Sequence, residues 1–234
     1  ALACGNSFVL KPPALAPTAA VRLAELLKEA GLPDGVFNVV HCSNDDAEQL
    51  YTDPRIAAVS FVGSSGVAEY IYKTASAHGK RVQAFGAAKN HAIVMPDADL
   101  DLTVKSIIAS RVINTGQVCN CCERVYVHSS IKDVFIEKLL DGFGKALVEA
   151  LKVGPGCMRG KEENEMGPVV SDTHQKKVLG YIDKGASEGA KLVVDGRKLR
   201  VSGYDDGYYV GGTLFDNVTP DMTIWREEIF GPVL

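Results

Sequence analysis

Short apolar segments alternate with helix-like segments over roughly the first 90 residues. Strand-like runs occupy residues 7–10, 36–40, 56–63 and 81–85, and segments of helical composition separate them. Residues 56–63, IAAVSFVG, are almost continuously apolar, as expected of a strand inside a parallel sheet. Strands that alternate with helices through short connections build an open sheet with helices on both faces. The sequence therefore predicts an α/β fold with a doubly wound parallel sheet.

Beyond residue 90 the alternation continues with longer helices. The segment AIVMPDADLD predicts a strand, a turn and a helix start whose three aspartates favour the positive helix N-terminus; a divalent-metal site is the alternative. Residues 131–151 have the apolar spacing of a long amphipathic helix, and residues 172–189 form another. The segments KLVVDG, GYYVGG and TLFDNV predict short strands, so a second α/β region follows the first.

Charge and cysteine content limit the classes of function. A net charge of −4 and an isoelectric point near 5.8 disfavour nucleic acid and anionic membranes as partners. No apolar run approaches the roughly 20 residues of a membrane span. Six cysteines, three of them clustered, are too few for a disulfide scaffold, so we expect reduced thiols and a cytoplasmic protein, with the mitochondrial matrix as alternative. Both chain ends lie in apolar runs, which predicts a fragment of a longer polypeptide.

Two strand-to-helix connections lie where open α/β sheets bind ligands, beyond the carboxyl ends of strands. Lys11 directly follows the strand at residues 7–10, and Gly63, Ser64 and Ser65 form the turn into a helix. Such a turn presents backbone N–H groups to a phosphate. A tight turn with a serine N-cap explains the same residues without a ligand, and neither GxGxxG nor GxxxxGK[ST] occurs. The pattern alone leaves both interpretations open.

The stretch INTGQVCNCCERVYV places three cysteines, Cys119, Cys121 and Cys122, within four residues. Cys119 and Cys122 have the C-x-x-C spacing of zinc sites and thiol–disulfide enzymes. Zinc needs further ligands, which no second C-x-x-C or histidine pair supplies, and a redox pair normally opens a helix, whereas ERVYV is strand-like. A nucleophilic cysteine needs an exposed position at the end of an element, which GQVC after a long helix fits.

The segment EEIFGP, residues 227–232, fits an exposed acidic pair beside a core aromatic residue. With ACGNSFVLKP, GLPDGVFNVV, SFVGS, GQVC and MGPVVS, it occurs in an order and spacing that resembles the NAD(P)-dependent aldehyde dehydrogenase superfamily over essentially the whole chain. GKRVQ and AKNHAIVMPDADLD are similar to methylmalonate-semialdehyde dehydrogenases, which form an acyl-CoA. SRVINTGQVCNCCERVYV is more similar to lactaldehyde or glycolaldehyde dehydrogenases, which form a free acid.

The resemblance implies roles for five residues and implies no metal. Cys119 is the nucleophile: it forms a thiohemiacetal with the aldehyde, which delivers hydride to the nicotinamide and becomes a thioester. Water or coenzyme A then releases the acyl group, and the Cys119 backbone N–H supplies half of the oxyanion hole. Lys11 reaches the adenosine ribose, Ser64 the pyrophosphate and Glu228 the nicotinamide ribose. Phe230 packs beside the nicotinamide ring.

Among the positions that depart from the family pattern, Phe85 and Ala14 bear on the chemistry. Phe85 takes the position of a glutamate found in hydrolytic members, and phenylalanine cannot deprotonate water. Acyl-CoA-forming members also lack this glutamate, so Phe85 favours the methylmalonate-semialdehyde branch. Ala14 replaces a glutamate that usually binds the adenosine ribose, which weakens the preference for NAD and admits NADP. Cys121 and Cys122 inherit no catalytic role and are interpreted as small packing residues.

The resemblance predicts an oxidoreductase that oxidises a small aldehyde or semialdehyde with NAD or NADP, and with coenzyme A as a candidate co-substrate. Residues 1–88 would form part of a dinucleotide-binding domain, and residues 89–234 a thiol-bearing catalytic domain truncated at its C-terminal end. The full-length protein is expected to be a homo-oligomer. The alternative is a catalytically inactive fragment or pseudoenzyme that retains part of a nucleotide-binding fold.

Overall fold

The computed structural model describes residues 1–144, 153–154 and 166–234. These residues form two compact units, Ala1–Gly86 and Ala87–Leu234. Parallel strand pairs and helices occur in both units, which confirms the predicted α/β class. Of the described helices, none is long and apolar enough to cross a membrane.

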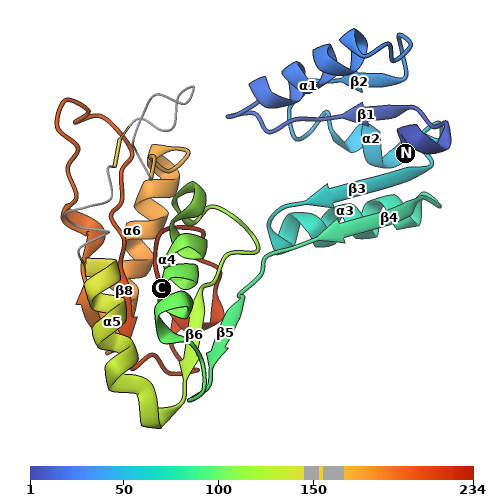
Figure 1. Cartoon of the computed structure of the whole chain (residues 1–234). Coiled ribbons are helices and arrows are strands. Elements are labelled where there is room, and N and C mark those ends of the chain that lie inside the picture. The colour runs from blue at the N-terminus through green and yellow to red at the C-terminus, as the bar shows by residue number, and fades with distance from the viewer. Residues whose placement is uncertain (145–152, 155–165) are drawn as a thin grey trace. The chain divides into compact units, whose positions relative to one another are not determined.

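The first unit contains two parallel strand pairs with helices between them (Figure 1). Its elements are η1 (Leu2–Cys4), β1 (Phe8–Leu10), α1 (Thr18–Glu29), β2 (Phe37–Val39), α2 (Glu48–Thr52), β3 (Ala58–Val62), α3 (Ser65–Ala77) and β4 (Arg81–Phe85). Strand β1 pairs with β2, and β3 pairs with β4. Parallel partners cannot be joined by a tight turn, so a helix connects the strands of each pair.

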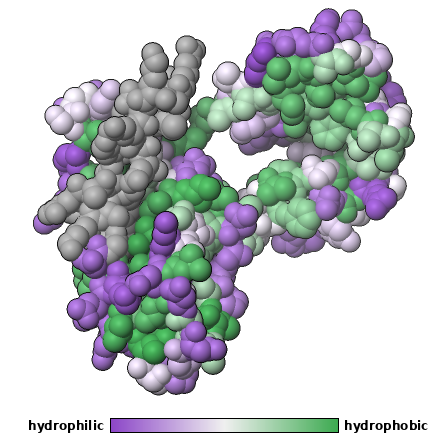
Figure 2. Space-filling model, in the orientation of Figure 1, coloured by the Kyte–Doolittle hydropathy of each residue, from purple (hydrophilic) through white to green (hydrophobic). Residues whose placement is uncertain are grey.

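One face of the β3–β4 pair is exposed. Burial alternates along both strands, and α3 contributes the buried side chains Ala68, Ile71 and Ala75 to the unit. Val62 and Phe85 lie opposite each other and are 62% and 52% exposed. Figure 2 shows hydrophobic residues on the surface of this unit. The apolar sequence of β3 predicts cover on both faces, and the described residues cover only one of them.

The second unit joins a parallel strand pair to an antiparallel one. Its elements are β5 (His91–Val94), α4 (Leu100–Val112), η2 (Ile113–Gly116), β6 (Arg124–Val127), η3 (Ser129–Ile131), α5 (Lys132–Gly144), α6 (Asp172–Ser187), β7 (Lys191–Val194), η5 (Gly196–Lys198), β8 (Leu214–Asp216) and α7 (Thr223–Arg226). Strands β5 and β6 are parallel, and β7 and β8 are antiparallel. Asp99 caps α4 by accepting a hydrogen bond from Leu102 N, which agrees with the helix-start interpretation. The part of the predicted 131–151 helix beyond residue 144 lies outside the described residues.

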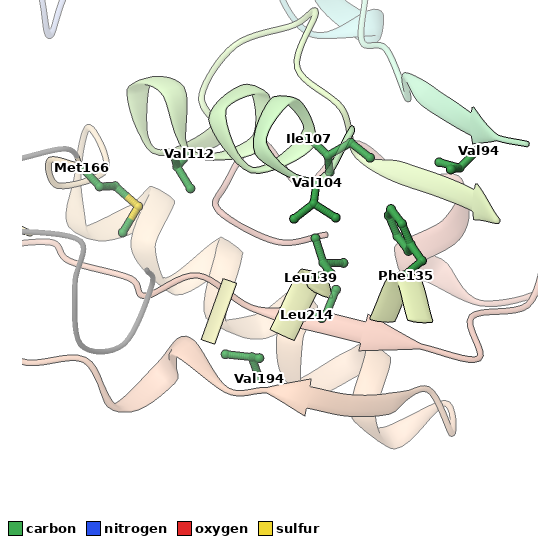
Figure 3. Packing of buried hydrophobic residues seen from close by; sticks show 9 residues of the cluster. All are labelled: Val94, Val104, Ile107, Val112, Phe135, Leu139, Met166, Val194 and Leu214. Carbon is green, nitrogen blue, oxygen red and sulfur yellow. The ribbon is translucent and has the colours of Figure 1, made fainter. Parts of the chain in front are cut away.

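Two apolar clusters hold the second unit together. The first lies between α4, α5 and the nearby strands, and Figure 3 shows its buried members: Val94, Val104, Ile107, Val112, Phe135, Leu139, Met166, Val194 and Leu214. The second packs α6 against α7 and the C-terminal segment, through Val178, Ile182, Ile224, Ile229 and Val233 among others. The second cluster thus places Ile229 of the EEIFGP segment in the core of the unit.

The strand predicted for GYYVGG, residues 207–212, is wrong. The backbone of this segment bonds to two different partners: Tyr208 accepts from Val169 N, and Gly211 N donates to Gly196 O. A strand needs consecutive bonds to one neighbour, so these single bonds leave the segment outside any ladder.

We expect Phe135→Ala to destabilise the second unit by about 3–5 kcal/mol, because Phe135 is 1% exposed and its loss leaves a cavity in the first cluster. Urea unfolding followed by the fluorescence of Trp225, the single tryptophan, measures this change. The matched control is Val134→Ala, at a neighbouring position that is 50% exposed, with a change within about 0.5 kcal/mol. Equal effects of the two substitutions would contradict the packing described.

Candidate active site

Cys119 lies in a turn between the end of α4 and the start of β6. The chain leaves α4 through Asn114, Thr115 and Gly116, whose φ angles of 48°, 58° and 73° are all left-handed. Consecutive left-handed residues reverse the chain within one turn, and Gly116 adopts this conformation without a Cβ penalty. Residues 117–123 therefore leave the helix axis and, with the three residues before them, form a separate loop, which we call the cysteine turn.

The MGPVVS segment packs against this loop. Thr115 Oγ1 donates to Gly167 O at 2.8 Å, and Gln117 Oε1 accepts from Val170 N at 2.9 Å. Thr115 is buried, so its hydroxyl needs such a partner. Two of the segments that carry the family resemblance thus bond directly to each other.

Gly116 also lies against Gly231 of the EEIFGP segment. A Cβ added to Gly116 would lie 2.3 Å from Gly231 O and 2.4 Å from Arg111 Nη2. The fully buried Arg111 donates to Gly116 O at 2.7 Å and to Cys122 O at 3.0 Å. The cysteine turn is therefore held between a buried arginine and a segment far away in the sequence.

The three cysteines differ in exposure. Cys119 is exposed, Cys121 is 1% exposed and Cys122 is half-buried. The Cys121 thiol donates to Val118 O at 2.8 Å, and the Cys122 thiol donates to Arg124 O at 3.3 Å. Burial raises the pKa of both of these thiols. Their burial agrees with packing roles, while Cys119 has the access that a nucleophile needs.

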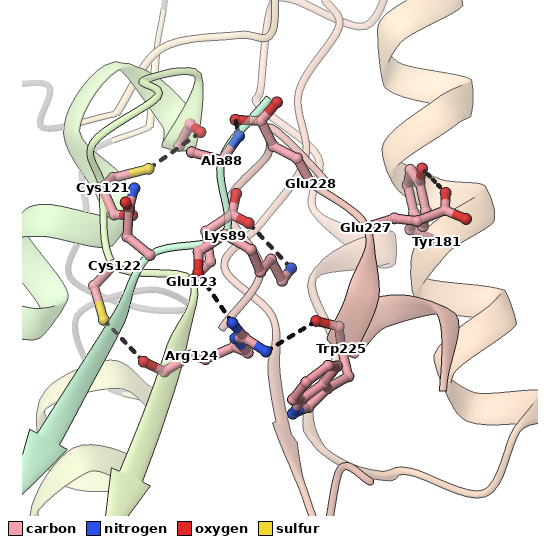
Figure 4. Close-up of polar contacts among 12 residues, drawn as sticks. Ala88, Lys89, Cys121, Cys122, Glu123, Arg124, Tyr181, Trp225, Glu227 and Glu228 are labelled. Carbon is pink, nitrogen blue, oxygen red and sulfur yellow. Dashed lines mark hydrogen bonds and ion pairs between the residues drawn. The ribbon is translucent and has the colours of Figure 1, made fainter. Parts of the chain in front are cut away.

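A buried ionic cluster supports the end of the turn (Figure 4). Glu123 is 6% exposed, and its carboxylate lies 3.0 Å from Lys89 Nζ and 3.4 Å from Arg111 Nη1. Burial lowers the pKa of Lys89, and the Glu123 carboxylate opposes that shift. Arg124 donates to Trp225 O at 3.3 Å, and its guanidinium lies 4.3 Å from the Trp225 ring centroid. The cluster thus links the turn to α7.

The two predicted cofactor residues of EEIFGP lie in the same unit as Cys119. Glu228 is half-buried and accepts from Ala88 N at 3.2 Å. Phe230 has a left-handed φ of 59°, and its carbonyl accepts from His174 Nε2 at 2.7 Å. The structure therefore places Glu228 and Phe230 on the segment whose Gly231 touches the cysteine turn. Their roles toward a cofactor stay predictions.

The neighbouring Glu227 points to a different partner. Its carboxylate accepts from Tyr181 OH at 2.6 Å, and burial together with this hydrogen bond raises the pKa of Tyr181 to about 12. Tyr181 lies on α6. The acidic pair is thus divided: Glu227 anchors α6, and Glu228 lies beside Ala88 (Figure 4).

Lys11 and Ser64 lie in the first unit, at the carboxyl ends of β1 and β3. Lys11 is half-buried. Ser64 is exposed at the N-cap of α3, and its hydroxyl makes no capping hydrogen bond. The structure thus places Ser64 at the start of a helix, and its role toward a phosphate group stays a prediction.

The described residues contain no group of three or more His, Cys, Asp or Glu side chains that could hold a metal ion. In the C-x-x-C pair, Cys119 is exposed and the Cys122 thiol bonds to a backbone carbonyl. The zinc interpretation of the spacing therefore finds no ligand set in this part of the chain.

The sequence profile of the aldehyde dehydrogenase family matches residues 1–234. The chain belongs to the aldehyde dehydrogenase family. Malonate-semialdehyde dehydrogenase 2 from Geobacillus kaustophilus is 50% identical over 234 residues, which are the whole chain and 46% of that enzyme. This aldehyde dehydrogenase chain thus spans about half the length of the curated relatives it matches.

Solved structures give the same assignment. A protein from Sinorhizobium meliloti, described as a methylmalonate-semialdehyde dehydrogenase in complex with NAD, is 46% identical with a TM-score of 0.92. The match covers 100% of this chain and 46% of that one. A lactaldehyde dehydrogenase is 38% identical with a TM-score of 0.87, covering 98% of this chain and 46% of its own. These matches confirm the α/β fold of this chain.

Sequence reasoning missed three polar residues that lie in the cysteine turn or contact it: Asn90, Arg111 and Glu123. Arg111 is a charged residue at a buried position of α4, beside Val112. A cation on the apolar side of a helix is a signal of a buried partner, because an unpaired buried charge is strongly unfavourable. Asn90 and Glu123 gave no comparable signal in the sequence.

We expect Gly116→Ala to destabilise the second unit by about 2–4 kcal/mol, since it combines a left-handed residue with a Cβ 2.3 Å from Gly231 O. Gly180→Ala is the matched control, because a Cβ there meets nothing within 4 Å. Gly180 lies inside α6, so this change should stabilise by about 0.5–1 kcal/mol. Trp225 fluorescence in urea measures both, and a harmless Gly116→Ala would refute the close approach.

We expect iodoacetamide to modify Cys119 at least about tenfold faster than Cys121 in the folded chain, because burial protects Cys121 and raises its pKa. Peptide mass spectrometry over a time course at pH 8 measures each rate. The exposed Cys4 serves as the internal reference for an accessible thiol. Faster modification of Cys121 than of Cys119 would contradict the turn geometry.

Proposed function

We propose that this aldehyde dehydrogenase oxidises a small semialdehyde, of the malonate or methylmalonate type, with NAD or NADP and transfers the acyl group to coenzyme A. The observation that carries the proposal is the exposure of Cys119 on a turn that contacts the EEIFGP segment, while Cys121 is turned inward. The choice of branch is supported among the solved structures by 46% identity to the Sinorhizobium meliloti protein described as a methylmalonate-semialdehyde dehydrogenase, against 38% to the lactaldehyde dehydrogenase.

Cys119 supplies the nucleophile in this proposal. Its thiolate sulfur bonds to the aldehyde carbon, and the carbonyl oxygen becomes an oxyanion that the Cys119 backbone N–H stabilises. When bound, the nicotinamide cofactor accepts a hydride from that carbon. Cys119 then carries the acyl group as a thioester, and attack by the coenzyme A thiol returns the free Cys119 thiol.

Four residues are proposed to hold the cofactor. Ser64 and the first N–H groups of α3 fit the pyrophosphate, and Lys11 beyond β1 reaches the adenosine ribose. Glu228 would bind the nicotinamide ribose, and Phe230 would pack beside the ring. Support for the last two comes from the contact between their segment and the cysteine turn.

The end of β4 offers no general base for a hydrolytic reaction. Ala84 and Phe85 are its last residues, and neither side chain can accept a proton from water. A thioester that water attacks slowly remains available to the stronger thiol nucleophile, which favours coenzyme A as the acyl acceptor.

We also assign residues 1–88 to a dinucleotide-binding domain and residues 89–234 to the thiol-bearing domain. A homo-oligomer and a cytoplasmic location belong to the same proposal for the whole protein. The location is supported by the bacterial origin of the relatives, and the mitochondrial matrix has no such support.

The test measures the reduction of NAD and of NADP with each of three substrates: malonate semialdehyde, methylmalonate semialdehyde and lactaldehyde. Each substrate is tested with and without coenzyme A. The test uses the chain alone and a chimera in which the chain replaces the matched segment of the Geobacillus kaustophilus enzyme. We expect Cys119→Ala to lower kcat by about 10⁴-fold or more. Cys4→Ala, an exposed cysteine of the first unit, should leave kcat unchanged.

Equal rates of cofactor reduction with and without coenzyme A would refute the acylating branch. A folded chimera without any cofactor reduction would instead favour the alternative of an inactive, nucleotide-binding fragment. That alternative is supported for the isolated chain by its 46% share of the relative's length.

A further inference from the structure

Asn90 bonds to both ends of the loop that carries the cysteines. Its side-chain Nδ2 donates to Cys119 O at 2.6 Å and to Cys121 O at 3.2 Å. Its backbone carbonyl accepts from Glu123 N at 3.0 Å and from Arg124 N at 3.1 Å. One residue therefore holds the start of the loop with its side chain and the end of the loop with its main chain.

The position of Asn90 is itself determined by the sheet. Asn90 directly precedes β5, and in the β5–β6 ladder His91 lies opposite Arg124. Strand pairing thus fixes the Asn90 backbone relative to the end of the loop. A side chain anchored on a strand holds its partner more accurately than one anchored on a second loop.

The chemistry of the two side-chain contacts specifies an amide. Both acceptors are backbone carbonyls, so the group between them has to provide two N–H donors, which a primary amide nitrogen does. An aspartate of nearly the same shape provides only acceptors and would repel both carbonyls. Alanine would leave the carbonyls without this partner.

We propose that Asn90 is a positioning residue for the nucleophile. Its amide fixes the peptide planes after Cys119 and Cys121, so that the Cys119 thiol projects outward and Cys121 stays buried. The catalytic consequence rests on the proposed function, because it concerns the direction from which Cys119 approaches an aldehyde. The effect on the loop is independent of that function.

A positioning role and a role in thiol ionisation have different consequences. Orientation of a nucleophile matters in the transition state, so its loss lowers kcat while KM and the pH profile of the bare thiol change little. A small alkylating reagent approaches from any side and does not require this orientation. Loss of thiolate stabilisation would instead shift the pH profile of Cys119 alkylation.

The experiment compares Asn90→Ala, Asn90→Asp and Asn120→Ala. Asn120 is the matched control: it directly follows Cys119, is exposed, and its side chain makes no hydrogen bond among the described residues. Iodoacetamide rates for each cysteine are measured by peptide mass spectrometry from pH 6 to 10. NAD or NADP reduction by malonate semialdehyde is measured in the chimera described above.

For both Asn90 variants we expect Cys121 to react about tenfold faster than in the parent chain, because two hydrogen bonds that hold its loop are lost. Cys119 should keep its alkylation rate and pH profile within about twofold in Asn90→Ala. In the chimera, kcat should fall by about 10–100-fold with KM little changed. Asn120→Ala should match the parent in every measurement.

Unchanged protection of Cys121 in Asn90→Ala, or parent-like behaviour of Asn90→Asp, would overturn the proposal. If Cys42 of the first unit also reacts faster with iodoacetamide when Cys121 does, the variant is generally unfolded, and the proposal is overturned as well. A shifted pH profile of Cys119 in Asn90→Ala would replace positioning by an electrostatic role. If the parent chimera reduces no cofactor, the proposed function fails, and the alkylation rates still decide the role of Asn90.

Discussion

The close approach of Gly116 and Gly231 is the contact on which the candidate site depends. Neither residue has a side chain, so the backbone that leads to Cys119 can touch the backbone of the EEIFGP segment. A Cβ on Gly231 would also meet Val178 of α6 at 2.7 Å, so the segment is confined from both sides. This confinement fixes Gly231, which lies on the same short segment as Glu228 and Phe230, against the cysteine turn.

Buried charged side chains also hold the cysteine turn, through hydrogen bonds and ion pairs. Arg111 directs its donors to two carbonyls of the turn and to the Glu123 carboxylate, and Lys89 completes the cluster. Buried charges are favourable only when paired, so removing any one member leaves the others exposed to a desolvation cost. The arrangement thus connects several buried charges to a turn that combines an exposed cysteine with an inward-facing one.

Much of this fold could be predicted from local sequence. The strand at residues 81–85 has the predicted bounds, and Ser64 occupies the predicted N-cap of α3. GYYVGG was mispredicted because its aromatic and β-branched residues suit a strand, while its backbone partners lie on two unrelated segments. Local pattern reports which residues suit a strand, and it does not report whether one continuous neighbour is available.

The sequence by itself determined the class of fold, the family and the residue types of the candidate chemistry. These follow from short-range periodicity and from motifs that are contiguous in the chain. Tertiary structure alone decided which acidic residue of EEIFGP lies beside Ala88, and that Asn90 reaches Cys119. The physical reason is that these outcomes depend on contacts such as Gly116 with Gly231, between residues whose separation in the chain carries no local signal.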